Sequence, residues 1–229
     1  MTIKKLLIAN RGEIASRIIS SAHDMGISCV AIYTEADQDT PYVREADQAF
    51  KLSDSYLNSK EILDIAIKSN SDAIHPGYGF LSENAAFANQ VKKSNIKWVG
   101  PSANAIKKMG DKLTAKEIAI KANVPTLPMT SDPKKANSIG YPILVKAAAG
   151  GGGKGMRIVN KAKDLKESIK SAEREAEGGF GDKRVFLERY IARSRHIEIQ
   201  ILGDSYGNII HLGERELSLI HISEPTRPY

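Results

Sequence analysis

The residues best suited to chemistry are a lysine and a run of glycines in the middle of the chain. Lys146 lies near the end of an apolar stretch that begins at Tyr141, and four consecutive glycines occupy positions 150–153. Backbone N–H groups unshielded by a Cβ form a cradle for phosphate oxygens, and a lysine supplies a point charge for the same oxygens. This combination favours a nucleotide phosphate as the ligand. The alternative interpretation is a flexible surface hairpin that binds nothing.

Two familiar phosphate-binding motifs do not fit this stretch. Gly150, Gly152 and Gly155 match G-x-G-x-x-G, but the dinucleotide fingerprint also requires a helix to open at the loop. Residues 156–159 alternate and are β-branched, which predicts a strand instead. A Walker loop fails because Gly155 stands where Ser or Thr should follow Lys154. The sequence therefore predicts two strands joined by a glycine flap that could fold over a nucleotide.

Alternating strand and helix patterns fill the first hundred residues and precede the lysine and the glycine run. The predicted strands are residues 5–9, 28–33, 72–74 and 97–99, and the predicted helices follow residues 10–13, begin after Asn58 and span 84–93. A strand, a helix and a strand within about thirty residues make a βαβ unit, whose two strands are parallel. The first part of the chain is therefore predicted to be α/β, with a doubly wound parallel sheet.

Two polar loops follow predicted strands of this sheet. Residues 10–13 follow the first strand, and residues 75–84 follow the third with His, Tyr, Ser and Glu between Pro and Gly. Ligands of such sheets bind beyond the carboxyl ends of the strands, where both loops would lie. A loop that docks on a neighbouring domain is an equally good interpretation of residues 75–84.

The second part of the chain begins with helices and ends with strands. Residues 103–122 predict a helical pair broken at Gly110, and the proline-rich residues 123–128 predict a boundary. After the glycine hairpin, the pattern predicts an amphipathic helix from Leu165, a turn over 178–182, and strands over 185–190, 196–202 and 209–212. Alternation places the polar side chains of the second of these strands on one face, namely His196, Glu198 and Gln200.

Composition narrows the function classes. The 229 residues carry 33 Lys and Arg against 27 Asp and Glu, a net charge of +6 that suits anionic small molecules. Only 6% of the residues are aromatic, and no basic run is interleaved with aromatics, so we expect no nucleic-acid surface. No apolar run approaches the ~20 residues of a membrane span, and no signal peptide is visible, so we expect a cytoplasmic protein. The lone cysteine, Cys29, excludes an internal disulfide and a cysteine zinc site.

Five motifs together resemble those of a known family. They are residues 9–15, the decapeptide 75–84, Gly110-Asp111-Lys112, the glycine hairpin and residues 194–200. In this order they resemble the amino-terminal half of biotin carboxylases, the ATP-dependent ligase component of acetyl-CoA, propionyl-CoA or pyruvate carboxylases. The resemblance covers roughly residues 3 to 218. It implies an N-terminal α/β domain (1–102), linking helices (103–125), the small flap subdomain of an incomplete ATP-grasp domain (126–191) and the start of its large subdomain (192–229).

The resemblance also implies roles for individual residues. Lys112 and Lys146 resemble lysines that contact the ATP phosphates. The implied flap glycines are Gly152 and Gly153, the implied adenine segment is Glu188, Arg189, Tyr190 and Ile191, and His196 is implied near the ribose. Plainer interpretations stay open: Lys112 as an exposed helix lysine, Glu188 as a salt-bridge partner and His196 as a polar residue on a sheet face.

In the family, ATP with Mg2+ activates bicarbonate to carboxyphosphate, whose CO2 passes to biotin. The resemblance thus implies ATP, bicarbonate, a biotinylated carrier domain and a carboxyltransferase component as partners, in a homodimer. It also implies a place in fatty acid biosynthesis if the parent is an acetyl-CoA carboxylase. The alternatives are another ATP-grasp ligase, such as a carbamoyl-phosphate synthetase half, and a non-catalytic basic binding module.

The match ends after Ser218. The residues from about 219 to 229 do not carry the family's next polar groups, and no catalytic residue or metal ligand of the family is identifiable in the chain. We therefore expect an ATP-site half without biotin carboxylase activity, which is either a truncated fragment with a foreign tail or a chain ended by a frame error.

Overall fold

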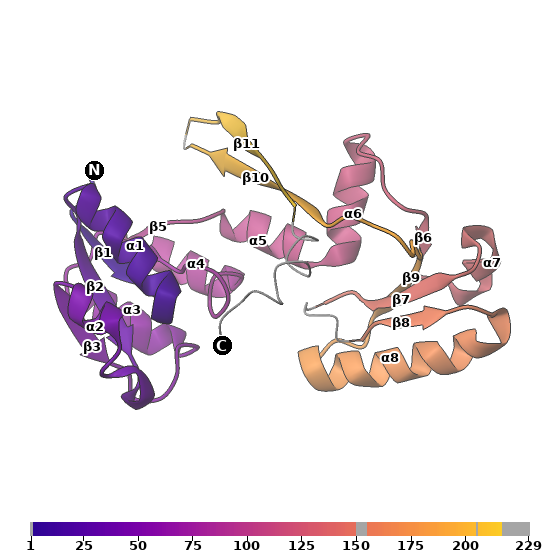
Figure 1. Cartoon of the computed structure of the whole chain (residues 1–229), viewed down its shortest axis with the longest axis horizontal. Helices are drawn as coiled ribbons and strands as arrows, with labels where there is room; N and C mark the ends of the chain where they lie inside the picture. The colour runs from indigo at the N-terminus through magenta and orange to yellow at the C-terminus, as the bar shows by residue number, and fades with distance from the viewer. Residues whose placement is uncertain (1, 150–154, 205, 217–229) are drawn as a thin grey trace.

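Two α/β units joined by a pair of helices make up the computed structural model (Figure 1), which describes residues 2–149, 155–204 and 206–216. The first unit contains a five-stranded sheet in the order β3-β2-β1-β4-β5, and every neighbouring pair in it is parallel. Its strands are β1 (Lys5–Ile8), β2 (Ser28–Tyr33), β3 (Gln48–Lys51), β4 (Ala73–His75) and β5 (Lys97–Trp98). Its helices are α1 (Gly12–Asp24), α2 (Pro41–Glu45), α3 (Ser59–Lys68) and α4 (Ala85–Lys93), with the 3-10 turn η1 (Glu35–Asp37).

Helices cover both faces of this sheet, as the alternation of side chains along a strand requires. Leu6 and Ile8 of β1 belong to a core that includes residues of α1 and α2. Leu7 belongs to the core on the opposite face, where Ile62 of α3 and Phe87 of α4 pack. The predicted doubly wound α/β domain is confirmed.

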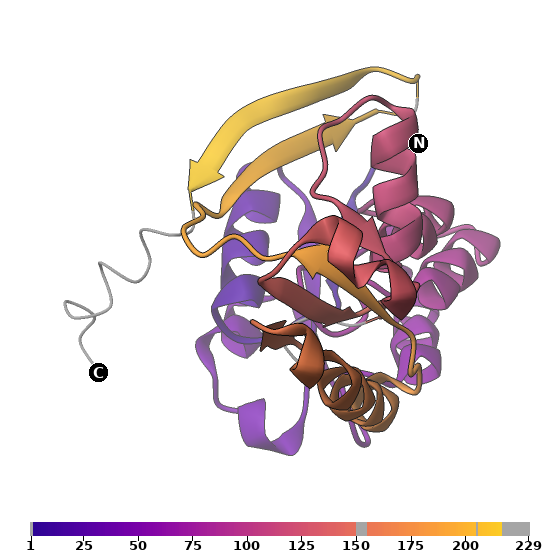
Figure 2. The same cartoon turned by 90° about the vertical axis from the view of Figure 1, so that its right-hand side faces the viewer.

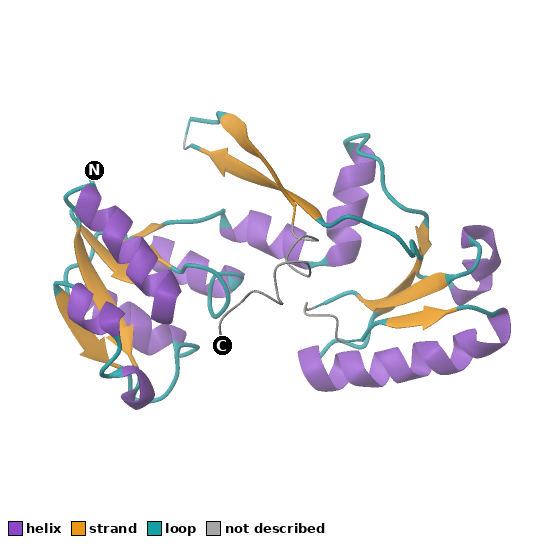
Figure 3. Cartoon of the chain, in the orientation of Figure 1, coloured by secondary structure: helices purple, strands orange, loops and turns teal. Residues whose placement is uncertain are grey.

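The linking helices are α5 (Ala103–Gly110) and α6 (Lys112–Lys121), and they meet at Asp111. The second unit follows with β6 (Met129–Thr130), β7 (Ile143–Ala147), β8 (Arg157–Val159) and β9 (Val185–Arg189), and with α7 (Ala136–Ile139), α8 (Leu165–Phe180) and the turns η2 (Pro133–Lys135) and η3 (Ala162–Asp164). Its sheet is antiparallel, in the order β6-β9-β7-β8, and α8 runs along one face of it (Figure 3). The pairing of β7 with β8 confirms the predicted hairpin.

A separate two-stranded sheet, β10 (Ile197–Gly203) paired with β11 (Ile209–Glu216), projects away from the second unit (Figure 2). Large apolar side chains of this hairpin are more than two-fifths exposed, namely Ile197, Ile199, Ile201, Leu202, Ile209, Ile210 and Leu212. Among the described residues, α8 packs along one face of the four-stranded sheet, but no element packs as extensively on either face of the hairpin.

Three details correct or extend the sequence predictions. The turn predicted over 178–182 is wrong at its start, because α8 continues through Phe180 and ends at Gly181, whose φ of +67° is a left-handed helix cap. α2, β3, β6 and α7 were not predicted. Within the described residues, no helix has both the length and the apolar character that a membrane span would need.

Candidate functional site

The candidate site begins on the open face of the four-stranded sheet. Ile143 and Val145 of β7 point toward α8 and are fully buried, so Lys146 points to the opposite face. β7 pairs with β9 so that Lys146 lies opposite Phe186, which makes Glu188 a diagonal neighbour of Lys146 on the same face. Lys146 Nζ donates to Glu188 Oε2 at 2.9 Å.

Helix α6 brings two more lysines to this face. Lys112 and Lys116 are four residues apart, so they share one side of the helix. Lys112 Nζ donates to the carbonyl oxygens of Ala147 at 3.2 Å and Ala149 at 3.5 Å. Lys116 Nζ donates to Glu188 Oε1, the oxygen that Lys146 does not contact. We call Lys112, Lys116, Lys146 and Glu188 the lysine cluster.

Asp111 fixes the start of α6 beside the sheet. Its side chain accepts the Thr114 N–H at 2.9 Å as the N-cap of α6, and its other oxygen accepts from Arg184 Nη2 at 2.8 Å. The Lys112 backbone N–H donates to the Ala148 carbonyl at 3.2 Å. α6 contributes no fully buried residue, so these polar contacts, more than apolar packing, set where its lysines lie.

The lysine cluster carries a formal charge of +2, since it combines three ammonium groups with one carboxylate. Burial alone would raise the pKa of Glu188, but the hydrogen bonds and charges of Lys116 and Lys146 outweigh it, and the pKa lies below its ordinary value. Burial, with the charge of Lys146, lowers the pKa of Lys112. A half-buried place with surplus positive charge is electrostatically suited to a polyanion.

The other site residues predicted from the sequence lie at the end of β9, before β10 and outside the described residues. The backbone N–H groups of Arg189 and Tyr190 donate to the carbonyls of Pro128 and Pro142, each at 3.1 Å, and Ile191 is exposed where the chain leaves the sheet. His196 precedes the exposed β10–β11 hairpin, and its Nε2 lies 3.7 Å from Glu198 Oε1. Gly152 and Gly153 lie outside the described residues.

The loop over 75–84 faces the linking helices. A hollow of about 540 Å³ is lined by Ser82 and Glu83 of this loop, by residues of α5 and by Lys112. The same loop is tied to its own sheet by Asn10, whose buried Nδ2 donates to the carbonyls of Pro76 at 2.7 Å and Tyr78 at 2.9 Å. Its first half is therefore a rigid structural turn, and its second half borders the space beside Lys112.

The loop over 10–13 has a structural partner that the sequence did not reveal. Arg11 Nε donates to Asp37 Oδ2 at 2.6 Å, and Tyr56 OH donates to the same oxygen at 2.6 Å. Tyr42 OH lies 2.9 Å from Tyr56 OH, and Asp37 is almost fully buried. The hydrogen bond from Arg11 is the largest influence on the Asp37 carboxyl and lowers its pKa against the effect of burial. This network holds the loop to the sheet.

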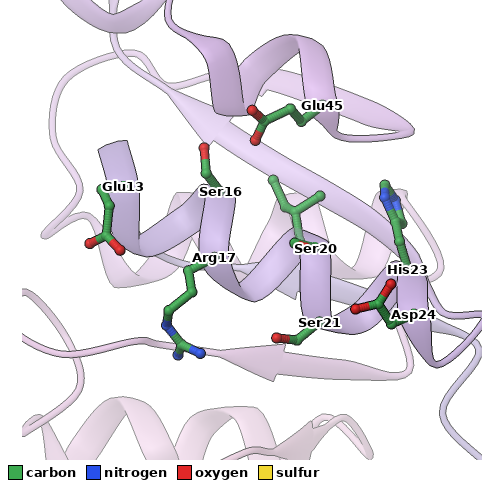
Figure 4. Close-up of a pocket in the computed structure, with 9 residues that line it drawn as sticks. Glu13, Ser16, Arg17, Ser20, Ser21, His23, Asp24 and Glu45 are labelled. Carbon is green, nitrogen blue, oxygen red and sulfur yellow. The ribbon is translucent and has the colours of Figure 1, made fainter.

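A hollow of about 680 Å³ on the outer side of α1 contains none of the predicted site residues. Figure 4 shows it bordered by Glu13, Ser16, Arg17 and Asp24 of α1 and by Glu45 of α2. Its charges are mixed and its mouth is wide, whereas the lysine cluster combines a surplus of positive charge with partial burial. We therefore place the site at the lysine cluster.

One group of possible metal donors lies elsewhere among the described residues. Donor atoms of His23, Cys29 and Asp47 lie within 4.8 Å of one another. Asp47 Oδ2 already accepts the Cys29 N–H at 2.7 Å and lies 3.0 Å from His23 Nε2. Burial, together with the Asp47 charge, raises the pKa of the Cys29 thiol to about 11, which favours a protonated, unreactive thiol.

Sequence reasoning missed Lys116 as a member of the site. Its four-residue spacing from Lys112 was a usable signal, because it places both side chains on one face of a predicted helix. Its pairing with Glu188, 72 residues along the chain, had no local signal.

Two protein-family models match successive parts of the chain. Residues 2–106 match the biotin carboxylase N-terminal domain, and residues 111–224 match the ATP-binding domain of the carbamoyl-phosphate synthase L chain. The second match concerns only an ATP-binding domain that both kinds of enzyme share. A carbamoyl-phosphate synthetase half is therefore not supported.

Curated relatives agree over nearly the whole chain. Biotin carboxylase 1 of Bacillus subtilis is 50% identical over 230 residues, which cover 95% of this chain and 51% of that relative. Pyruvate carboxylase of Staphylococcus aureus is 46% identical and is matched over 95% of this chain and 20% of its own length. The chain thus spans about half the length of the Bacillus relative.

Solved structures give the same result. One match is the biotin carboxylase domain dimer of Hydrogenobacter thermophilus 2-oxoglutarate carboxylase, in complex with MgADP, ADP and bicarbonate. It has a TM-score of 0.91 and is 44% identical, and the match covers 95% of this chain and 51% of that chain. A biotin carboxylase complex with β,γ-ATP from Campylobacter jejuni also has a TM-score of 0.91, with 46% identity and coverage of 94% and 51%.

Proposed function

The chain carries the N-terminal and ATP-binding domains of a biotin carboxylase, and we propose that it binds ATP with the phosphate chain at the lysine cluster. The observation that carries this proposal is the surplus positive charge of the cluster: Lys116 and Lys146 share a single carboxylate, Glu188, and Lys112 lies close enough to Lys146 for the charge of Lys146 to lower its pKa. Phosphate oxygens would supply the anions that balance it. The solved relatives bound to ADP and ATP support this choice of ligand.

We place the base of the nucleotide along residues 188–191, beside the strand end that carries Glu188. Because the N–H groups of Arg189 and Tyr190 already donate to protein carbonyls, contacts to the base would use carbonyl groups or the Ile191 N–H. In this proposal Gly152 and Gly153 close over the phosphates, and His196 lies near the ribose. The domain boundaries near residues 102, 125 and 191 belong to the same proposal.

Magnesium accompanies ADP in the Hydrogenobacter relative. The described carboxylates nearest the cluster do not fit this ion. Both Glu188 oxygens face lysines, and Asp111 caps α6 and binds Arg184. Hard cations need oxygen ligands that are not already neutralised by ammonium groups. These described residues are therefore not metal ligands in the proposed site, and their part is to neutralise and orient the phosphates.

For the whole protein we propose the ATP-dependent carboxylation of biotin with bicarbonate, as a ligase. Its partners would be a biotinylated carrier domain and a carboxyltransferase component, in a homodimer. Curated relatives that are biotin carboxylase, pyruvate carboxylase and acyl-CoA carboxylase subunits support this reaction class. The role of the lysine cluster in it would be to hold the phosphate chain while the terminal phosphoryl group is transferred to bicarbonate.

Calorimetric titration with ATP tests the nucleotide site. Lys146→Ala should weaken ATP binding about 10- to 100-fold, because a hydrogen bond to a charged group contributes about 1.5–3 kcal/mol. Lys121→Ala is the matched control, since Lys121 ends the same α6 and is exposed. Equal ATP affinities of Lys146→Ala and the Lys121→Ala control would remove Lys146 from the site.

A further inference from the structure

Glu188 is bridged by two lysines from different parts of the chain. Lys146 Nζ, from the neighbouring strand, donates to Oε2 at 2.9 Å, and Lys116 Nζ, from α6, donates to Oε1. The Glu188 side chain is only 11% exposed and that of Lys116 only 12%. The carboxylate therefore depends on these two ammonium groups for its charge balance.

This arrangement creates a conflict once a phosphate arrives. Lys146 is the more exposed of the two partners, at 26%, and it is the one proposed to contact the phosphates. A phosphate oxygen and Glu188 Oε2 would compete for the same ammonium group. If Glu188 had Lys146 as its sole partner, releasing Lys146 would leave a nearly buried carboxylate unpaired, which is strongly unfavourable.

We propose that Lys116 is a positioning residue that keeps Glu188 neutralised, and thereby frees Lys146 to turn to the ATP phosphates. The inference rests on the proposed ATP site and extends it to Lys116, which would act on the nucleotide only indirectly, through Glu188 and Lys146. Lys116 is suited to this role because its side chain lies deeper than that of Lys146 and bonds the oxygen that Lys146 leaves alone.

The position of Lys116 on α6 supports the same role. One turn earlier on the same face, Lys112 is held by the carbonyls of Ala147 and Ala149, at the exit of β7. Lys116 therefore anchors the middle of α6, whose first residue, Lys112, also belongs to the cluster. This polar anchor matters because no residue of α6 is fully buried. Without the Lys116–Glu188 contact, Glu188 would retain Lys146 more tightly, and the helix would lose its charged link to β9.

A double-mutant cycle on ATP affinity tests the inference with the full chain. We expect Lys116→Met to weaken ATP binding about tenfold and Lys116→Arg, which keeps the charge, to stay within about threefold of wild type. In a Glu188→Gln background there is no carboxylate to neutralise, so Lys116→Met should then change the affinity by less than about twofold. Lys121→Met, the same substitution at the exposed end of α6, is the control and should bind ATP as wild type does.

The outcomes separate the inference from the function beneath it. Wild-type chain that does not bind ATP would overturn the proposed function and this inference together. If wild type binds ATP, equal affinity of Lys116→Met would overturn only the inference. An equal loss in the Glu188→Gln background would also overturn it, since Lys116 would then act directly on the phosphates or on the fold. A Lys116→Arg loss as large as that of Lys116→Met would do the same, and thermal unfolding verifies that each variant is folded.

Discussion

Replacing Gly77 by alanine tests how the loop over 75–84 is fixed to the parallel sheet. Gly77 has a φ of +63°, and a Cβ there would lie 2.6 Å from Asn10 Nδ2 and 2.8 Å from Ile14 Cγ2. Asn10 is fully buried, and its Nδ2 holds the carbonyls on both sides of Gly77. The added methyl group would therefore displace the residue that joins the loops after β1 and β4.

Gly79 offers a matched comparison in the same loop. Its φ is +71°, but a Cβ there would meet nothing within 4 Å. Alanine in the left-handed region costs about 1–2 kcal/mol, and both substitutions carry this cost. Gly77→Ala should also lose the two Asn10 hydrogen bonds, at about 1 kcal/mol each. We expect destabilisation of about 3–4 kcal/mol for Gly77→Ala against about 1–2 kcal/mol for Gly79→Ala.

Urea unfolding followed by tryptophan fluorescence measures this difference in the first unit alone. Trp98 is the single tryptophan of the sequence, lies in β5 and packs edge-on against Phe87 at 5.6 Å between ring centroids. The free energies of unfolding of both variants are compared with wild type at equal m-values. A difference of less than about 1 kcal/mol between the two alanine variants would refute the role of Asn10 in fixing this loop, since each of its hydrogen bonds should contribute about that much.

Two further predictions concern stability and solubility. Burial, with the charge of Arg17, lowers the pKa of His75 below 6.5, and its Nδ1 accepts the Gly77 N–H at 3.0 Å. The unfolded chain therefore binds the proton more tightly than the folded chain. The contribution of His75 to the free energy of unfolding should be full above about pH 6.5 and fall as the pH drops through the folded-state pKa. His75→Asn should reduce the difference between the free energies of unfolding measured in urea at pH 7 and pH 5. Ile210→Lys, on the exposed β10–β11 hairpin, should reduce self-association in sedimentation experiments and leave the Trp98 unfolding transition unchanged. Unaltered association would show that the hairpin is not the surface through which the chain associates.

The elements that the sequence predicted well are those with a strong local period. The buried strand at Ser28–Tyr33 reads as a continuous apolar run, and the helix cap at Asn58, which accepts the Glu61 N–H at 3.2 Å, follows directly from residue spacing. The short helix over 41–45 and the strand over 48–51 were missed. The strand is only four residues long and mostly exposed, since it forms the edge of the sheet, so it shows no apolar run.

The turn misplaced at 178–182 has a similar cause. Two adjacent glycines normally indicate a helix end, yet α8 continues through them because its apolar face packs against β7 and β9. Tertiary packing thus outweighs a local cost of about 1 kcal/mol per glycine. The left-handed residue that ends the helix is Gly181, which the local sequence could not distinguish from its glycine neighbours.

The candidate site divides along the same line. Lys112 and Lys146 could be named because each lies in a recognisable motif, and the structure places both in one cluster. Glu188 was placed in the implied adenine segment, with a salt-bridge partner as the plainer interpretation. Its side chain does form such salt bridges, with Lys116 and Lys146, and so joins α6 to the sheet through a contact that depends on strand register. The antiparallel pairing of β7 with β9 sets which acid lies diagonal to Lys146. Register is fixed by the apolar face against α8, so the electrostatics of the open face depend on packing on the buried one. A one-residue slip of β9 would bury the Glu188 carboxylate against α8 and leave the lysines without an anion, which is why the cluster is a property of the fold and not of any single motif.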